Sequence, residues 1–483
     1  MPPLSQTEKM LECATDDPAP TYFRTPDGRT FAHTDGRTLL VLGKDFRAWL
    51  ADRYQARHDR TPHLSNVKEA VETLHLRNAQ FPRAEAHVRV APDRAASPPA
   101  IWIDLGSDEW TAIRVDPHGW RIESHPAAGP YLVRPRPVPP MVPPVQGGDL
   151  NDLRRFLNVS TEDDLRLIVA WLVMALRPTG PYPILSFTGG QGSAKSTNAR
   201  VLGSLVDPTV PYVMKLARDD RDLWVAASKR HVLVFDNVSW IDDWQSDELC
   251  RLATGGGTAQ RTLYTNEEET VLEACRPIML NGIVNAVTRG DLADRSIMIE
   301  CPPITDYKPE VQFRREFEEA KPALIGALLD ALSATLRAVR SVELPRRSIR
   351  MADFAKWGAA VEAGLGWPTG SFLEAYEANR QTMRSSVIEA DAVAQALVAR
   401  FGSEEAEPFE GPISALAREL EGMAGETTPG RGWPKSVQAW AAHIRRLQTV
   451  LAQEGIKIDW HTDSRNRTTY GVARMAADVE VPA

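Results

Sequence analysis

The chain has 483 residues, of which 43% are hydrophobic and 25% are charged, and its formal net charge is −8. This length predicts two to four domains, and the acidic balance argues against a protein that coats nucleic acid indiscriminately, while local basic patches could still bind DNA. The 4 cysteines form no disulfide framework, and neither a membrane-length apolar run nor a signal-peptide pattern occurs, so we expect a cytoplasmic protein with no membrane partner.

Residues 1–128 are predicted to form an N-terminal α+β domain of unknown role, behind a loose polar end of about 20 residues. Turn signals at Asp27-Gly28 and Asp35-Gly36 separate its first extended runs. The periodicity of apolar residues then predicts helices over 44–58 and 65–80, and strands over 87–90, 100–105 and 112–122. Asp104 and Asp108 are interpreted as turn residues, so we expect no primase site here.

A proline-rich segment, residues 129–148, marks the clearest boundary in the sequence. It is interpreted as a semi-rigid spacer or as an extended strap that lies on a domain. Within the next predicted domain, 149–305, two helices over 149–157 and 161–177 come first, with Ser160 as the N-cap of the second. Strand and helix signals then alternate, as a parallel α/β sheet requires, and residues 306–390 are predicted to be helical.

The most informative motif is FTGGQGSAKST, residues 187–197, in which an apolar strand leads through a glycine-rich turn into a helix. Glycines allow backbone N–H groups to curl around phosphate oxygens, and the helix N-terminus adds partial positive charge. Lys195 can reach the β- and γ-phosphates, and the Ser196 hydroxyl can bind Mg²⁺. Ala194 stands where the pattern usually has glycine, so we expect a slightly stiffer loop. The predicted ATP-binding residues are Gly189, Gly190, Gln191, Gly192, Ser193, Ala194, Lys195, Ser196 and Thr197.

Two later strands end in side chains suited to the same site. Residues 231–235 are mostly apolar and are followed by Asp236, 41 residues after Lys195, whose carboxylate could hold Mg²⁺. The apolar run 277–280 is followed by Asn281, whose amide could bind the γ-phosphate or the attacking water; a turn-forming Asn-Gly pair is the alternative. The candidate catalytic residues are therefore Lys195, Asp236 and Asn281, and the candidate metal ligands are Ser196 and Asp236.

Two arginines could act beyond this pocket. Arg295 is a candidate catalytic residue, an arginine finger for the nucleotide of a neighbouring subunit, with Arg289 as the substitute. The alternative is an ion-paired helix end that uses Asp291 and Asp294. Residues 253–269 are predicted to form a β-hairpin carrying Arg261, either as a grip on DNA in a central pore or as a plain surface hairpin.

Together these runs resemble the superfamily 3 helicases, which are AAA+-like hexameric ATPases of viruses, phages and plasmids. The likeness is closer to the ATP-binding proteins of phages and mobile elements that are related to viral primase-helicases. It covers roughly residues 150–305 and is carried by TGGQGSAKST, VLVFDN, RLATGGGTAQRTLYT, RPIMLNG and DLADRS. The resemblance implies a P-loop NTPase core with phosphate and Mg²⁺ bound by Lys195 and Ser196, the metal held by Asp236, Asn281 as sensor and Arg295 as finger.

One departure from the family concerns the catalytic base. Many such ATPases place a second acid directly after the metal-binding aspartate, and this chain has Asn237 there. The base could be Asp236 acting through water, or a nearby acid such as Asp242, Asp243 or Glu248. The sequence leaves these alternatives open.

Residues 391–483 are predicted to form a winged-helix-like DNA-binding domain. An amphipathic helix over 436–453 precedes two strands, 456–460 and 468–474, joined by a basic loop. Between residues 431 and 474 the chain has eight Lys or Arg and three Asp or Glu, a balance suited to contact with DNA. A solvated helix face, or a winged helix that docks on protein, is the alternative. The candidate DNA-binding residues are Arg261, Arg445, Arg446, Arg465 and Arg467.

These features predict an ATP- and Mg²⁺-dependent DNA helicase or translocase for the replication of a phage, plasmid or integrated element. We expect a ring, with a hexamer favoured, that binds single-stranded DNA in its pore and duplex DNA through the C-terminal domain. One alternative is a DNA-associated AAA+ ATPase that loads or remodels proteins without unwinding. Another is a DNA-binding regulator or defence component that uses ATP as a switch.

Overall fold

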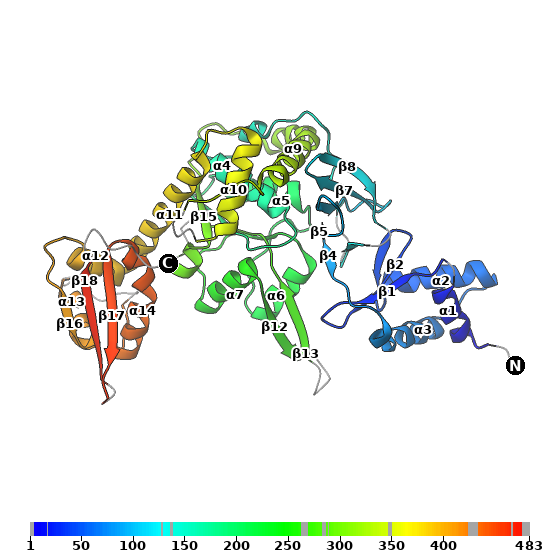
Figure 1. Ribbon diagram of the computed structural model, residues 1–483, viewed down its shortest axis with the longest axis horizontal. Helices are drawn as coiled ribbons and strands as arrows, with labels where there is room; N and C mark the ends of the chain where they lie inside the picture. The colour runs from blue at the N-terminus through cyan, green and yellow to red at the C-terminus, as the bar shows by residue number, and fades with distance from the viewer. Residues whose placement is uncertain are drawn as a thin grey trace.

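The computed structural model describes residues 4–16, 18–126, 129–135, 139–261, 269–282, 286–287, 289–345, 350–423, 433–464 and 467–475. A central α/β region lies between an N-terminal and a C-terminal region, which gives the molecule an arched outline (Figure 1). The predicted mixed α/β architecture with a helical later part is confirmed. Among the residues described, no helix combines the length and apolarity needed to cross a membrane.

The N-terminal region packs three helices on a five-stranded sheet of order β1-β2-β3-β9-β4. Its helices are α1 (Gln6–Thr15), α2 (Lys44–His58) and α3 (Leu64–Leu76), and its strands are β1 (Thr21–Arg24), β2 (Thr30–Thr34), β3 (Arg37–Leu40), β4 (Ala86–Val88) and β9 (Tyr131–Val133). The prediction of a loose end was wrong for α1. Ser5 and Glu8 form a capping box at its start, and Met10 and Cys13 are buried on its inner face, so capping and burial both stabilise the helix.

A second, antiparallel sheet belongs physically to the central region. It consists of β5 (Val90–Asp93), β6 (Ala100–Asp104), β7 (Thr111–Asp116) and β8 (Gly119–Ser124). The Trp120 indole N–H donates to Asp330 of α9 (Glu310–Ala338) at 2.9 Å. Ile101 and Ile103 lie in the same hydrophobic cluster as the helices of the α/β region, so packing crosses the predicted boundary at residue 128.

A buried ion pair ties the start of this sheet to the α/β region. Arg89 Nε lies 2.9 Å from Asp207 Oδ1, and neither side chain is more than 3% exposed. Asp207 follows directly after α5 (Lys195–Val206), and its other oxygen accepts the N–H groups of His231 and Val232. Burial alone would raise the pKa of Asp207, but the charge of Arg89 and the hydrogen bond from the Val232 N–H bring it below its ordinary value, so the carboxylate stays ionised.

The described parts of the proline-rich segment lie on the fold as a strap, the second of the two interpretations. Strand β9 joins the N-terminal sheet beside β3 and β4. Met141 is buried, and the Val145 N–H donates to the Pro322 carbonyl in α9 at 3.0 Å. These contacts hold the segment against two separate parts of the protein.

The α/β region is built on a parallel sheet of order β11-β14-β10-β15. Its strands are β10 (Ile184–Thr188), β11 (Leu233–Phe235), β14 (Ile278–Asn281) and β15 (Ser296–Glu300), and its helices include α4 (Glu162–Ala175), α5, α6 (Asp220–Lys229), α7 (Asp243–Thr254) and α8 (Gly290–Ala293). Residues 149–157 form a 3₁₀ turn, Leu150–Arg155, in place of the predicted α-helix. The N-cap of α4 is Thr161 rather than Ser160, because Thr161 forms a capping box with Asp164.

A hairpin of β12 (Gly256–Arg261) and β13 (Glu269–Ala274) projects from this region between the two flanking ones (Figure 1). The chain then continues through α9, α10 (Ala352–Leu365) and α11 (Ser371–Ala390). The C-terminal region follows with α12 (Ala392–Phe401), β16 (Phe409–Gly411), α13 (Ile413–Met423), α14 (Val437–Gln453), β17 (Ile456–Thr462) and β18 (Thr468–Arg474). Two strands were predicted in this region, and the prediction missed β16, which pairs with β18 and completes a three-stranded antiparallel sheet.

Candidate functional site

Three segments singled out in the sequence meet at one edge of the parallel sheet. The glycine-rich loop follows β10, Asn281 ends β14, and Asp236 follows β11. These strands are direct neighbours, and the register pairs Phe187 with Asn281 and Leu280 with Phe235. Since parallel strands end at the same edge, their side chains face one space there.

The loop backbone has the shape of an anion cradle. Gly189 and Gly192 have φ of 138° and 76°, and a Cβ at Gly189 would lie 2.4 Å from the Cys301 carbonyl oxygen. Ala194 has φ of 59°, a left-handed conformation that costs a non-glycine residue about 1 kcal/mol and explains why glycine is usual there. In the described part of the chain, the N–H groups of residues 190–194 donate to no protein acceptor, so they are free to bind phosphate oxygens.

The two residues at the start of α5 make different contacts. Lys195 Nζ donates to the carbonyl oxygens of Gly189 at 2.8 Å and Gly190 at 2.6 Å, so the ammonium lies against the loop. The Ser196 hydroxyl donates to Asp236 Oδ1 at 2.9 Å. The predicted metal ligands are therefore adjacent.

The Ser196 hydroxyl and the Asp236 carboxylate suit a Mg²⁺ ion that also binds phosphate oxygens. Mg²⁺ prefers six oxygen ligands and commonly keeps water and phosphate among them, with only one or two protein ligands. No group of three or more His, Cys, Asp or Glu side chains that could hold a metal occurs among the described residues. Ser196 and Asp236 could thus hold Mg²⁺ together with a bound triphosphate, and they are too few to form a closed metal site alone.

Asn281 carries a buried donor without a partner. The residue is 2% exposed, and its Oδ1 accepts the Asn237 N–H at 3.0 Å. Within the described residues, its Nδ2 has no hydrogen-bond partner. A buried polar group left unpaired costs about 1–3 kcal/mol, which a ligand oxygen could offset. The Gly282 N–H donates to the Phe187 carbonyl of the loop strand at 3.1 Å, so this Asn-Gly pair is fastened to the site.

Two asparagines that sequence reasoning missed hold the loop in place. Asn158 Nδ2 donates to the carbonyls of Ser193 at 3.0 Å and Pro302 at 2.6 Å. Its backbone N–H donates to Asn198 Oδ1 at 3.0 Å, and Asn198 Nδ2 donates back to the Asn158 carbonyl at 3.1 Å. Asn198 is fully buried on α5, and a polar residue on the apolar face of that predicted helix was the available signal.

Of the four candidate bases, only Asp236 is seen to contact the start of α5. Asp242 caps α7 and accepts the Trp240 indole N–H at 3.1 Å. Glu248 accepts the Trp224 indole N–H at 2.6 Å and Arg251 at 2.7 Å. Asp243 is paired with Arg289 and Arg446, a contact described below. Since the other three carboxylates have structural partners, Asp236 acting through water is the simplest candidate.

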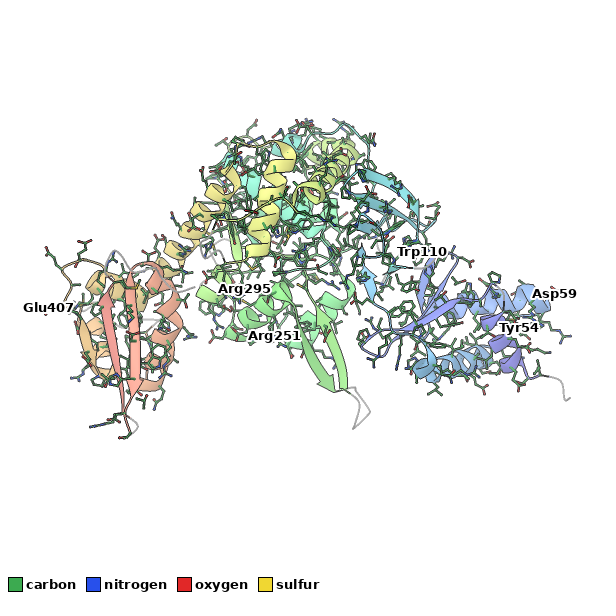
Figure 2. The ribbon with its side chains drawn as sticks, viewed as in Figure 1. Tyr54, Asp59, Trp110, Arg251, Arg295 and Glu407 are labelled. Carbon is green, nitrogen blue, oxygen red and sulfur yellow. The ribbon has the colours of Figure 1, made fainter. Side chains whose placement is uncertain are left out.

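The structure places Arg295 at the opposite edge of the sheet. It directly precedes β15, and its carbonyl accepts the Ile184 N–H at the start of β10. Its guanidinium pairs with Asp291, and Arg289 pairs with Asp247 at 3.1 Å, so within one chain both arginines belong to ion-paired helix ends. Figure 2 shows Arg295 at the margin of the central region nearest the C-terminal region. A finger role needs a neighbouring subunit and stays a prediction.

The candidate DNA-binding residues are dispersed. Arg445 is exposed and lies over the Trp460 ring at 5.1 Å. Arg446, on the same helix, instead pairs with Asp243 of α7 at 3.2 Å. Arg467 pairs with Asp463 at 2.9 Å and is 69% exposed. Arg261 ends β12, but its side chain lies outside the described residues, as does Arg465.

Comparisons with known proteins give the following findings. Residues 150–385 match the family model for the actinomycete integrative conjugative element replication protein, and residues 393–478 match the model for the C-terminal domain of the same proteins. No curated protein matches. Solved structures of the NrS-1 C-terminal region match with a TM-score of 0.42 at 12% identity, one over 98% of both chains and another over 94% of this chain and 95% of that one.

The two family matches follow one another in the chain and together cover about two thirds of it. They confirm the prediction of a replication protein of a mobile element, at the level of the family. The protein belongs to the replication proteins of actinomycete integrative conjugative elements.

Proposed function

We propose that this replication protein is an ATP- and Mg²⁺-dependent P-loop ATPase with an AAA+-like core, which acts as a ring-forming DNA helicase or translocase. The observation that carries the proposal is the 2.9 Å hydrogen bond between Ser196 and Asp236, beside a loop whose amides are free. In P-loop NTPases such a hydroxyl and carboxylate hold Mg²⁺, while the loop and its lysine hold the phosphates. Lys195, which lies on the loop carbonyls, would turn to the bound phosphates.

The DNA part of the proposal rests on the family and on the C-terminal region. The order α12-β16-α13-α14-β17-β18, with β18 in the middle of its sheet, is the plan of a winged helix. Exposed Arg445 stacks on Trp460, a pairing suited to a phosphate backbone or a base. The β12–β13 hairpin projects from the α/β region and would reach a strand in the pore of a ring (Figure 1).

The test is ATP turnover by the full-length protein with and without single-stranded DNA, alongside its mass with nucleotide. We expect stimulation by DNA, a hexameric mass, and loss of turnover in Lys195→Ala, with exposed Lys68→Ala as the control. Full turnover in Lys195→Ala would overturn the ATPase assignment. Strand displacement then separates a helicase from an ATPase that only loads or remodels proteins.

A second candidate, a DNA-binding regulator that uses ATP as a switch, is favoured by one observation. Asn237 replaces the usual second acid, and the nearby carboxylates of Asp242 and Glu248 already have structural partners. Without a dedicated base, hydrolysis would be slow. Turnover far below the usual range of about 1–10³ s⁻¹, combined with tight sequence-selective DNA binding, would favour the switch.

A further inference from the structure

Tyr307 stands exposed beside the glycine-rich loop. Its side chain hydroxyl is the nearest atom to the position that a Cβ on Gly192 would take, at 3.4 Å, and the residue is 72% exposed. No hydrogen bond to its hydroxyl is found within the described residues. An aromatic ring of this size left in solvent without a partner is a ready surface for a flat apolar ligand.

The segment that precedes Tyr307 is held beside the glycine-rich loop by hydrogen bonds. The Cys301 N–H donates to the Thr188 carbonyl at 2.8 Å, and the Pro302 carbonyl accepts Asn158 Nδ2 at 2.6 Å. Through Asn158 the segment also shares a contact with Ser193 of the loop. Tyr307 follows Pro302 by five residues, and its hydroxyl approaches Gly192.

The order of the strands indicates how a bound triphosphate would lie across the site. Asn281 and Asp236 follow β14 and β11, on one side of β10, whereas Tyr307 comes after β15, on the other side. If the metal and the terminal phosphate lie by Asp236 and Asn281, the nucleoside end of a triphosphate leaves the loop on the β15 side. Tyr307, which follows β15 and whose hydroxyl approaches Gly192, offers an exposed aromatic ring to that end of the nucleotide.

We propose that Tyr307 is the base platform of the nucleotide site and stacks on the nucleobase of the bound triphosphate. This inference rests on the proposed ATPase function and adds the residue that binds the part of the ligand beyond the phosphates. Stacking between an aromatic side chain and a base needs no particular hydrogen-bond pattern, so the platform supplies affinity for a nucleotide without reading which base it carries.

The experiment compares two ligands of the full-length protein, Mg²⁺-ATP and Mg²⁺-tripolyphosphate, which has the phosphates and lacks the base. Titration calorimetry gives the Kd of each. Tyr307→Ala should raise the Kd for ATP about tenfold, the size of one lost stacking contact, and leave tripolyphosphate binding unchanged. Tyr307→Phe and Tyr307→Trp keep a ring and should keep ATP affinity. Tyr212→Ala removes another partly exposed tyrosine, 37% exposed, and serves as the control.

The possible outcomes distinguish a failure of base stacking by Tyr307 from a failure of the proposed ATPase function. Wild-type protein that binds neither ligand would refute the ATPase itself, and Lys195→Ala should weaken both ligands. Equal losses for both ligands in Tyr307→Ala, or no loss for either, would overturn the base platform while leaving the phosphate site intact. A changed oligomeric mass with unchanged ATP affinity would also overturn it, because Tyr307 would then be a contact between subunits.

Discussion

The sheet-edge site and the basic surface of the C-terminal region were both predicted from polar side chains in characteristic positions. At the sheet edge, Ser196 and Asp236 meet although 40 residues separate them. In the C-terminal region, Arg446 turns to Asp243 of α7, and Arg467 pairs with Asp463 of its own loop. A strand end fixes where a short side chain lies, whereas a long arginine on a helix or loop pairs with whichever acid is within reach.

The largest effect should come from the carboxylate at the sheet edge. Asp236→Asn removes the charge that would hold Mg²⁺ and should lower ATP turnover by about 100-fold or more, since single preorganised electrostatic contacts are worth about that much. A Mg²⁺ titration of turnover measures it. Asp242→Asn changes an acid of the same segment that caps α7 and accepts the Trp240 indole N–H, and it should cost far less turnover. Similar losses of ATP turnover in both variants would show that Asp236 has no special role at the sheet edge.

A smaller effect is expected at Asn281. Its free Nδ2 would act on the γ-phosphate or the water, so Asn281→Ala should lower kcat by about 10–100-fold with little change in KM. Steady-state kinetics measure both constants. Asn281 also binds the Asn237 N–H, so thermal unfolding checks that the variant is folded. A raised KM with normal kcat would mean that the side chain only helps substrate to bind.

The two neighbouring arginines of α14, Arg445 and Arg446, should differ in their effect on DNA binding. Arg445→Ala should weaken DNA binding several-fold and reduce the salt slope by about one unit, because one phosphate contact is lost. Arg446→Ala should leave DNA affinity nearly unchanged, since that guanidinium is held by Asp243. Fluorescence anisotropy over a salt series measures both. Equal losses would show that Arg446 leaves Asp243 when DNA binds.

The smallest effect concerns stability against pH. Burial lowers the pKa of His231 to about 4, so its ring is neutral in the folded chain. An unfolded histidine binds a proton below pH of about 6.5, so the free energy of unfolding falls as the pH falls from about 6.5 toward 4, by about 1 kcal/mol between pH 7 and 5.5. Thermal scans should show a loss of a few °C, which His231→Gln reduces and the exposed His63→Gln does not. A pH response left unchanged by His231→Gln would contradict this origin.

Local patterns predicted the elements of the site well, and for a physical reason. A glycine turn that enters a helix at Lys195, and apolar runs that end at Asp236 and Asn281, are properties of short segments, so sequence alone carries them. Their meeting at one edge follows from the parallel pairing of β11, β14 and β10. What could not be predicted was the tertiary support, such as Asn158 on Ser193, because no local rule says which distant carbonyl a lone asparagine will reach.

Contacts between distant parts of the chain also explain the features that sequence reasoning missed elsewhere. Strand β16 has three residues and gains its order from pairing with β18, which a local pattern does not reveal. The partner of Arg446 is an acid some 200 residues away in the chain. By contrast, the capping box of Ser5 and Glu8 was visible in the sequence, and the surface helix that it begins could have been predicted.

The buried pair of Arg89 and Asp207 bears on how the protein can be dissected. The family match begins at residue 150, yet a fragment cut there would keep Asp207 and lose its cation. An isolated charge in such surroundings costs several kcal/mol, and the apolar groups of Ile101 and Ile103 would be missing from the core as well. The smallest piece able to fold unaided should therefore start upstream of Arg89. A fragment that begins at residue 150 should therefore be less stable than the longer chain, and a loss of activity in it would reflect folding rather than catalysis.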